Sequence, residues 1–210
     1  SVTGVQTCAL PICLSLNASI VNSWTGGALD FLWQSPGNWS RSHAPTANED
    51  ALITTSGGAD TITVSALGQQ ARKVTFTDSA DTFTFSGTNT FSFGAGASSI
   101  PGAMNISSAG STVNLNAGTT FSSLGTLQVS SGALNGNGAT LATTNFNQTG
   151  GAISGLAALT ANTSFSQTAG TISSGALKLV SNGTFNQGIP ASINVSSLEV
   201  GGSSAMNFAG

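Results

Sequence analysis

Three aspartates in the first half of the chain carry the side chains best suited to catalysis. Asp60, Asp78 and Asp81 flank the basic pair Arg72 and Lys73. Hydrolysis or elimination on a polysaccharide uses two or more carboxylates, often with a basic residue or calcium beside them. The next acidic residue lies close to the end of the sequence, so later segments do not extend the group. We therefore predict no catalytic residue and interpret the chain as a non-enzyme, leaving the activity of a longer protein open.

Two other patterns resemble ligand sites but are incomplete. GGADTITV (57–64) resembles half of the calcium-binding nonapeptide GGxGxDxUx, yet it lacks the middle glycine and has no tandem copy. His43 is the only histidine, and neither a cysteine nor a triad serine accompanies it. We therefore predict no metal ligand and no cofactor, and we expect His43 to be a surface residue.

Paired threonines in two short segments suggest a third kind of site. Thr61 and Thr63 form one TxT pair and Thr82 and Thr84 form the next, an arrangement found in ice-binding solenoids. The corresponding positions one period later are Ala and Asn. The threonine array therefore ends after two pairs, and we do not predict ice binding.

The composition limits the classes of partner. Only 5% of the 210 residues are charged, and the net charge is −3. Nucleic-acid surfaces need clustered Lys and Arg, and this chain has four basic residues in all. No apolar run approaches the length of a membrane-spanning helix. The chain is 39% hydrophobic and contains 11 Phe, which favours an ordered β structure over disorder.

A phrase of about ten residues recurs through the second half of the chain. Its copies are TLQVSSGALNG (126–136), NFNQTGGAISG (145–155), SFSQTAGTISS (164–174) and TFNQGIPASIN (184–194). Aligning the copies predicts two columns of core residues: Leu127, Phe146, Phe165 and Phe185 in the first, and Leu134, Ile153, Ile172 and Ile193 in the second. A period near 20 residues with short alternating strands is the signature of a solenoid.

The same alternation extends toward the N-terminus. Ile62, Phe83 and Met104 continue the first column at steps of 21, and a second arm is predicted through 74–76, 91–93 and 113–115. Parallel strand crossovers are right-handed. We therefore predict an all-β protein: a right-handed parallel β-helix of about seven coils with a roughly 20-residue period, and an eighth coil beginning near Phe208.

Polar residues also fall into columns between the predicted strands. Gln148, Gln167 and Gln187 align, and stacked amides can hydrogen-bond from coil to coil. Glycines align beside them, at positions where the backbone must turn with positive φ: Gly132, Gly151 and Gly170. We interpret both columns as structural.

The segment before the repeats holds all three tryptophans, Trp24, Trp33 and Trp39. A solenoid needs a cap over its first coil, and these aromatic rings supply the apolar area for one. A carbohydrate-stacking platform is the alternative role for the rings. The phrases WTGG, WQSPGNWS and PTANEDALI in this segment resemble the opening of secreted bacterial β-helix surface proteins, including autotransporter passengers and adhesin-like proteins.

The ends of the sequence differ in character from the rest. VTGVQTCALPI (2–12) resembles the translation of a sequencing adapter, so we interpret residues 1–13 as an artefact without structure. Cys8 and Cys13 then carry no disulfide argument. Residues 14–19 fit the tail of a signal peptide. We expect the cap over 20–60 and β-helix repeats over 61–210, truncated at the C-terminus.

The resemblance implies a function as well as a fold. It implies a secreted or cell-surface, structural or adhesin-like passenger fragment from the outer surface of a bacterium, without a catalytic site. The partner would be a surface or carbohydrate ligand, with neither nucleic acid nor a membrane span. The alternative is a β-helix enzyme acting on polysaccharides whose catalytic coils lie outside this fragment.

Overall fold

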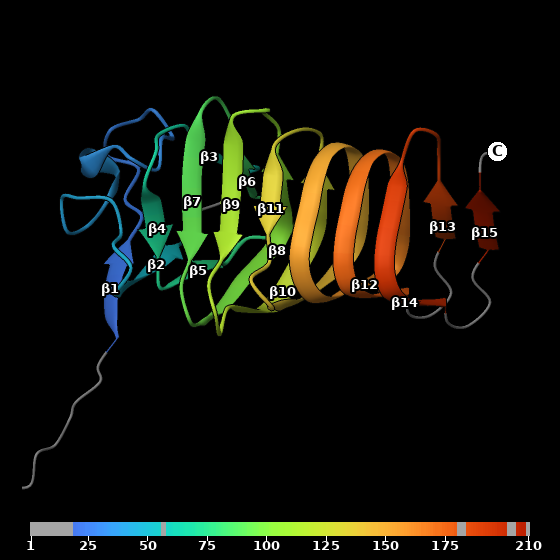
Figure 1. Cartoon of the computed structure of the whole chain (residues 1–210). Coiled ribbons are helices and arrows are strands. Elements are labelled where there is room, and N and C mark those ends of the chain that lie inside the picture. The colour runs from blue at the N-terminus through green and yellow to red at the C-terminus, as the bar shows by residue number, and fades with distance from the viewer. Residues whose placement is uncertain (1–18, 56–57, 180–183, 201–204, 209–210) are drawn as a thin grey trace, which may run out of the picture.

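The chain winds into a right-handed parallel β-helix, as the sequence predicts (Figure 1). The computed structural model describes residues 19–55, 58–179, 184–200 and 205–208. The solenoid has about 6 turns with a period of about 21 residues. The sequence predicted about seven coils of roughly 20 residues. The predicted adapter segment, residues 1–13, and residues 14–18 lie outside the described residues.

Strands make up 63% of the structure, and helix only 2%. In chain order the elements are β1 (Ile20–Ser23), the 3-10 helix η1 (Pro36–Asn38), β2 (Glu49–Ile53), β3 (Thr61–Val64), β4 (Gln69–Ala71), β5 (Lys73–Phe76), β6 (Thr82–Phe85), β7 (Asn89–Phe93), β8 (Ala97–Ile106), β9 (Ser111–Leu115), β10 (Thr120–Val129), β11 (Ala133–Asn135), β12 (Thr140–Leu179), β13 (Thr184–Gln187), β14 (Ser192–Val200) and β15 (Ala205–Phe208). Strand β12 is continuous through more than one turn of the helix (Figure 1).

One face of the solenoid, face A, contains the first predicted column. It is formed by β3, β6, the second halves of β8 and β10, two stretches of β12, and then β13 and β15. In successive coils Ile62 pairs with Phe83, Phe83 with Met104, and Met104 with Leu127. Strand β15 adds the further rung, although its register sets Met206, rather than Phe208, opposite Phe185.

A second face, face B, contains the second predicted column. Strands β4, β7, β9 and β11 pair in order, and β12 and β14 continue the face. Leu134 pairs with Ile153, and Ile172 pairs with Ile193. The prediction was wrong for 74–76, since the strand that precedes β7 on this face is β4. The alternation V-T-F marks a strand but does not specify the face to which it belongs.

Residues 74–76 lie instead on a third face, face C, which sequence reasoning did not separate. Here β1 pairs with β2, β2 with β5, β5 with the first half of β8, and that half with the start of β10. Ala51 pairs with Val74 and Ile53 with Phe76. Parallel pairing therefore begins already within the segment that we expected to act as the cap.

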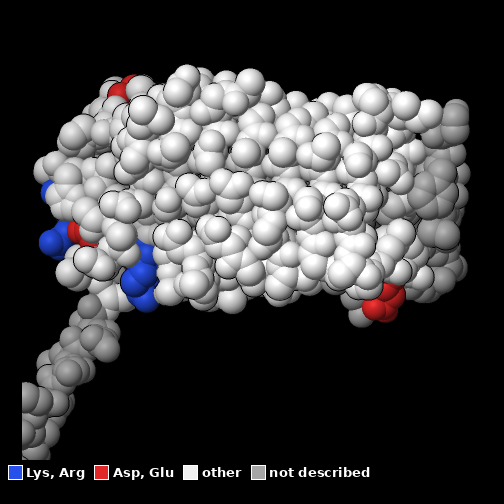
Figure 2. Space-filling model, viewed as in Figure 1, with Lys and Arg blue, Asp and Glu red and all other residues white. Residues whose placement is uncertain are grey.

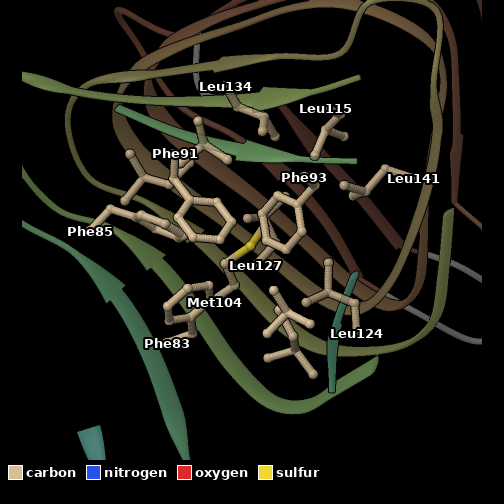
Figure 3. Close-up of a cluster of buried hydrophobic side chains, with 14 of the residues drawn as sticks. Phe83, Phe85, Phe91, Phe93, Met104, Leu115, Leu124, Leu127, Leu134 and Leu141 are labelled. Atoms are coloured by element: carbon tan, nitrogen blue, oxygen red, sulfur yellow. The ribbon is translucent and has the colours of Figure 1, made fainter. Parts of the chain in front are cut away.

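A cluster of buried hydrophobic side chains fills the space inside the three faces (Figure 3). In its first half, rings from faces A and B meet: Phe83 and Phe91 have centroids 5.3 Å apart, with ring planes at 89°. In its second half, Phe146, Phe165 and Phe185 stack along the axis. Their centroid spacings are 4.8 and 4.7 Å, and their ring planes differ by 16° and 6°. The predicted phenylalanine column is thus confirmed.

The predicted glutamine ladder lies inside the solenoid, at the corner between faces A and B. Gln148 and Gln167 are fully buried, and Gln167 Nε2 donates to Gln148 Oε1 at 3.1 Å. The same nitrogen lies within bonding distance of the carbonyl oxygens of Gly170 (3.2 Å) and Ser192 (3.1 Å). The buried amides thus bond to each other and to backbone carbonyl oxygens, as buried polar groups generally do.

The tryptophan segment closes the first coil. Trp33 is fully buried against Phe83 and Phe91, with centroid distances of 5.2 and 5.0 Å. Trp39 packs on Trp33 and donates from Nε1 to the Trp33 carbonyl oxygen at 2.6 Å. Trp24 meets Trp39 edge to face. Residues 38–43 also cross the outer side of β1 through backbone and side-chain hydrogen bonds, so that edge is covered.

A candidate binding groove

The five charged residues singled out as a catalytic group are not brought together. Arg72 Nη2 lies 2.6 Å from Asp50 Oδ2, and Lys73 Nζ lies 3.6 Å from the same oxygen. Asp50 is almost fully buried and belongs to β2 on face C. Both basic side chains therefore compensate a buried structural carboxylate, and neither contacts one of the three aspartates.

The three aspartates themselves have separate environments. Asp81 is 1% exposed, and its carboxylate accepts hydrogen bonds from Thr55 Oγ1 at 2.6 Å and from the Asp60 amide at 3.1 Å. Asp78 Oδ1 accepts a bond from the Ala80 amide at 2.8 Å, as in an Asx-turn. The Asp60 backbone amide thus contacts the Asp81 carboxylate. The Asp78 carboxylate forms its hydrogen bond within its own turn.

His43 belongs to an ion-pair cluster in the tryptophan segment. Its Nε2 lies 3.6 Å from Glu49 Oε1, and its Nδ1 lies 2.9 Å from the Ala44 carbonyl oxygen. Arg41 Nε reaches the same glutamate oxygen at 2.9 Å. Within the described residues there is no group of three or more His, Cys, Asp or Glu side chains arranged to hold a metal ion. None of the described helices is long and apolar enough to cross a membrane.

The threonine pairs lie in register on the outer side of face A, as expected. Thr61 pairs with Thr82, and Thr63 pairs with Thr84. The next rung is Ala103 with Asn105, so the array changes composition where the sequence indicated. Further along this side the outward positions remain uncharged.

A shallow groove of about 340 Å³ runs along the corner where face C turns into face A. One wall is the first outward column of face A: Thr82, Ala103, Thr126 and Asn145 occupy successive coils at paired positions. The other wall is formed by the turns that precede them, and the full lining is Ser79, Ala80, Thr82, Pro101, Gly102, Ala103, Gly125, Thr126, Thr144 and Asn145. The groove therefore spans four coils and follows the axis of the solenoid.

Small residues at the corner shape this groove. A Cβ on Gly102 would lie 1.9 Å from the Asp81 carbonyl oxygen, and one on Gly125 would lie 2.1 Å from the Pro101 carbonyl oxygen. Only glycine allows the turn of each coil to approach the coil before it so closely. The methyl group of Ala103 leaves space between the threonines on either side. The register shift between Leu124 and Thr126 sits at the same corner.

The groove offers neutral hydrogen-bonding groups. Its lining carries hydroxyl, amide and backbone groups and no charged side chain. Ser164 Oγ donates to Asn145 Oδ1 at 2.9 Å in the adjoining coil, which fixes the amide at the end of the groove. Figure 2 shows that the charged side chains in view gather mainly near the β1 end, while the long middle of the rod is uncharged. Such a lining suits a neutral, hydroxyl-rich ligand better than an ionic one.

The sequence did not predict this groove, because it is created by the backbone path and by residues with small or no side chains. The one available signal was the recurrence of glycine just before a face A strand, at Gly102 and Gly125. No protein-family model matches the chain, and neither a curated protein nor a solved structure matches it.

Proposed function

We propose that this chain is part of a secreted or cell-surface, adhesin-like β-helix protein that binds a neutral carbohydrate along its face C–face A corner. The observation that carries the proposal is the uncharged groove, which follows the solenoid axis over four coils. A groove of this form suits an extended polymer, because successive coils present similar groups at regular intervals of about 4.8 Å. A protein that binds a polymer without cleaving it needs only such a surface.

Two further features support an extracellular passenger-like role. The tryptophan-containing segment resembles the opening of secreted bacterial β-helix surface proteins in WTGG, WQSPGNWS and PTANEDALI. The described carboxylates have structural partners or stand alone, and none forms a pair across the groove. An enzyme that acts on polysaccharides with catalytic coils elsewhere is the alternative, and no feature of the groove favours it.

The test is a binding measurement on the purified chain with a matched pair of variants. Ala103→Trp fills the centre of the groove, and Ala133→Trp makes the same change at a partly exposed position of β11 on face B. The probes are neutral glucans, mannans and galactans, with polygalacturonate and chitosan as charged comparisons. We expect a neutral polymer to bind, Ala103→Trp to weaken that binding at least about tenfold, and Ala133→Trp to leave it unchanged.

Equal effects of the two tryptophans would contradict the groove as the site, and so would stronger binding of a charged polymer that Ala103→Trp weakens. Release of new reducing ends from a bound polymer would favour the enzyme alternative. Circular dichroism of both variants checks that the β-helix is intact.

A further inference from the structure

A second hollow, of about 220 Å³, lies at the opposite end of the described rod from β15. It forms between the loop that follows β1, the two threonines directly after β2, and Asp60. Its lining is mixed: two aromatic rings, three hydroxyl groups and one carboxylate, from Trp24, Thr25, Gly26, Phe31, Thr54, Thr55 and Asp60. None of these residues lines the groove described above, so the two sites are independent.

The Asp60 side chain is the exception among the acidic residues. Its backbone amide donates to Asp81, and its carbonyl oxygen accepts a bond from the Thr82 amide at 2.7 Å. Its carboxylate makes neither a hydrogen bond nor an ion pair to any described residue. The other acidic side chains all have such a partner or another interaction: Asp30, Glu49, Asp50, Asp78, Asp81 and Glu199. Among the described residues, the Asp60 carboxylate in the lining of the hollow therefore has no partner of opposite charge.

The two aromatic residues of the lining, of which Trp24 is 8% exposed, are held in place by their own contacts. Trp24 packs edge to face on Trp39, with ring centroids 5.1 Å apart and planes at 87°. Phe31 is 43% exposed, although its backbone carbonyl oxygen accepts a bond from the Thr63 amide at 2.9 Å. A large ring kept partly exposed by a fixed backbone is available to a ligand.

The loop that presents Phe31 is strained and tightly held. Leu29 and Phe31 both have positive φ, at 59° and 53°. Left-handed backbone at a residue with a side chain costs about 1–2 kcal/mol. Asp30 holds the loop between them, since its carboxylate accepts bonds from the Leu32 amide, Ser35 Oγ and Asn38 Nδ2: 3.0, 2.5 and 2.6 Å. Strain maintained by its surroundings in this way often marks a binding site.

We propose that this hollow binds an organic ammonium group, placed between the Asp60 carboxylate and the rings of Phe31 and Trp24. A cation near an aromatic ring is attracted by the negative face of the ring, and the carboxylate supplies the opposite charge. The threonine hydroxyls would accept hydrogen bonds from a primary ammonium or contact the hydroxyl groups of an amino sugar. A neutral sugar would leave the carboxylate without a counter-charge.

The experiment compares charged and uncharged ligands of the same shape on the full chain. Choline is the quaternary probe, and 3,3-dimethyl-1-butanol is its uncharged isostere; glucosamine and glucose form the second pair. Binding is followed by tryptophan fluorescence and by NMR shifts at constant ionic strength. We expect choline or glucosamine to bind at least about tenfold more tightly than its neutral counterpart.

The variants separate the charge from the fold. Asp60→Asn keeps the backbone bonds of this residue and removes its charge, and should weaken binding of the cationic probe about tenfold. Asp78→Asn makes the same change of charge outside the hollow and should leave binding unchanged. Binding of choline alone or of glucosamine alone identifies the source of the ammonium group. Equal binding of charged and neutral partners, full binding by Asp60→Asn, or no binding of either cation would overturn the proposal.

Discussion

Replacing Phe165 by Leu should destabilise the rod more than the same change at Phe146. Both rings are buried, at 0% and 1% exposure, and both point into the core from face A. Phe165 stacks on a ring in each neighbouring coil, at 4.8 and 4.7 Å. Phe146 stacks on Phe165 on one side and has Leu127 as its paired residue on the other. The two substitutions therefore differ by one aromatic pair.

The expected magnitude follows from this difference. Exchange of Phe for Leu in a core alters volume and shape by similar amounts at the two sites, and that shared cost is typically below about 1.5 kcal/mol. Each aromatic pair contributes about 0.5–1.5 kcal/mol beyond area burial. Phe165→Leu loses two pairs and Phe146→Leu loses one. The free energy of unfolding of Phe165→Leu should therefore fall by about 0.5–1.5 kcal/mol more than that of Phe146→Leu.

Urea denaturation followed by circular dichroism measures both variants against the parent chain. The comparison uses the change in midpoint, and it requires an unchanged denaturant slope, because repeat arrays can lose cooperativity when one coil is weakened. If the two variants lose equal stability, or if Phe146→Leu loses more, the stacked rings add nothing beyond their buried area, and the reasoning fails.

Two further predictions concern polar side chains. Gln167→Leu removes the donor for Gln148 Oε1 and for two backbone carbonyl oxygens, so the free energy of unfolding should fall by about 1–3 kcal/mol. Gln128→Leu, on the outer side of face A, should change it by less than about 0.5 kcal/mol in urea denaturation. A similar loss in both variants would refute a special role for the buried amide. Hydrogen bonds from Ser35 Oγ and the Leu32 amide hold the pKa of Asp30 below the ordinary value of an aspartate. Because the folded pKa is depressed, the carboxylate stabilises the fold above about pH 4, and this contribution is lost as the pH falls through the folded pKa. The stability difference between the parent and Asp30→Asn should therefore be present at neutral pH and shrink in acid; a constant difference across that range would contradict it.

The repeated columns could be predicted because each coil sets one residue directly over its equivalent in the coil before. Phe146, Phe165 and Phe185 recur at nearly constant steps, and constant steps in a parallel stack mean shared positions. The glutamine column follows the same rule, although the sequence did not indicate that the amides would be buried. Residue type and spacing together were sufficient for these columns.

Assignment of strands to faces could not be predicted in the same way. All three faces use short alternating strands, so V-T-F at 74–76 is equally compatible with face B and face C. The difference lies in the turns before and after it, whose lengths vary. The partners of Arg72 and Lys73 could not be predicted for the same reason. On face C these side chains reach Asp50 of the preceding coil and not the aspartates near them in sequence.

The groove was beyond sequence reasoning for a different reason. It depends on how closely one turn approaches another at Gly102 and Gly125, and on the small side chain of Ala103 between two threonines. Composition identifies such residues as permissive, but the hollow results from the backbone arrangement around them. The hollow beside Asp60 likewise depends on the left-handed backbone of Phe31, which a phenylalanine does not predict.

The parallel pairing of successive coils also determines how the rod responds to a pulling force. The hydrogen bonds between coils run along the axis, so tension applied at its two ends would peel turns away one after another from an end. Each turn of about 21 residues would extend to roughly 70 Å of chain, in place of the ~4.8 Å that it occupies in the stack. A rod built in this way would lengthen in steps under load, and the turns that had not yet opened would keep their faces intact.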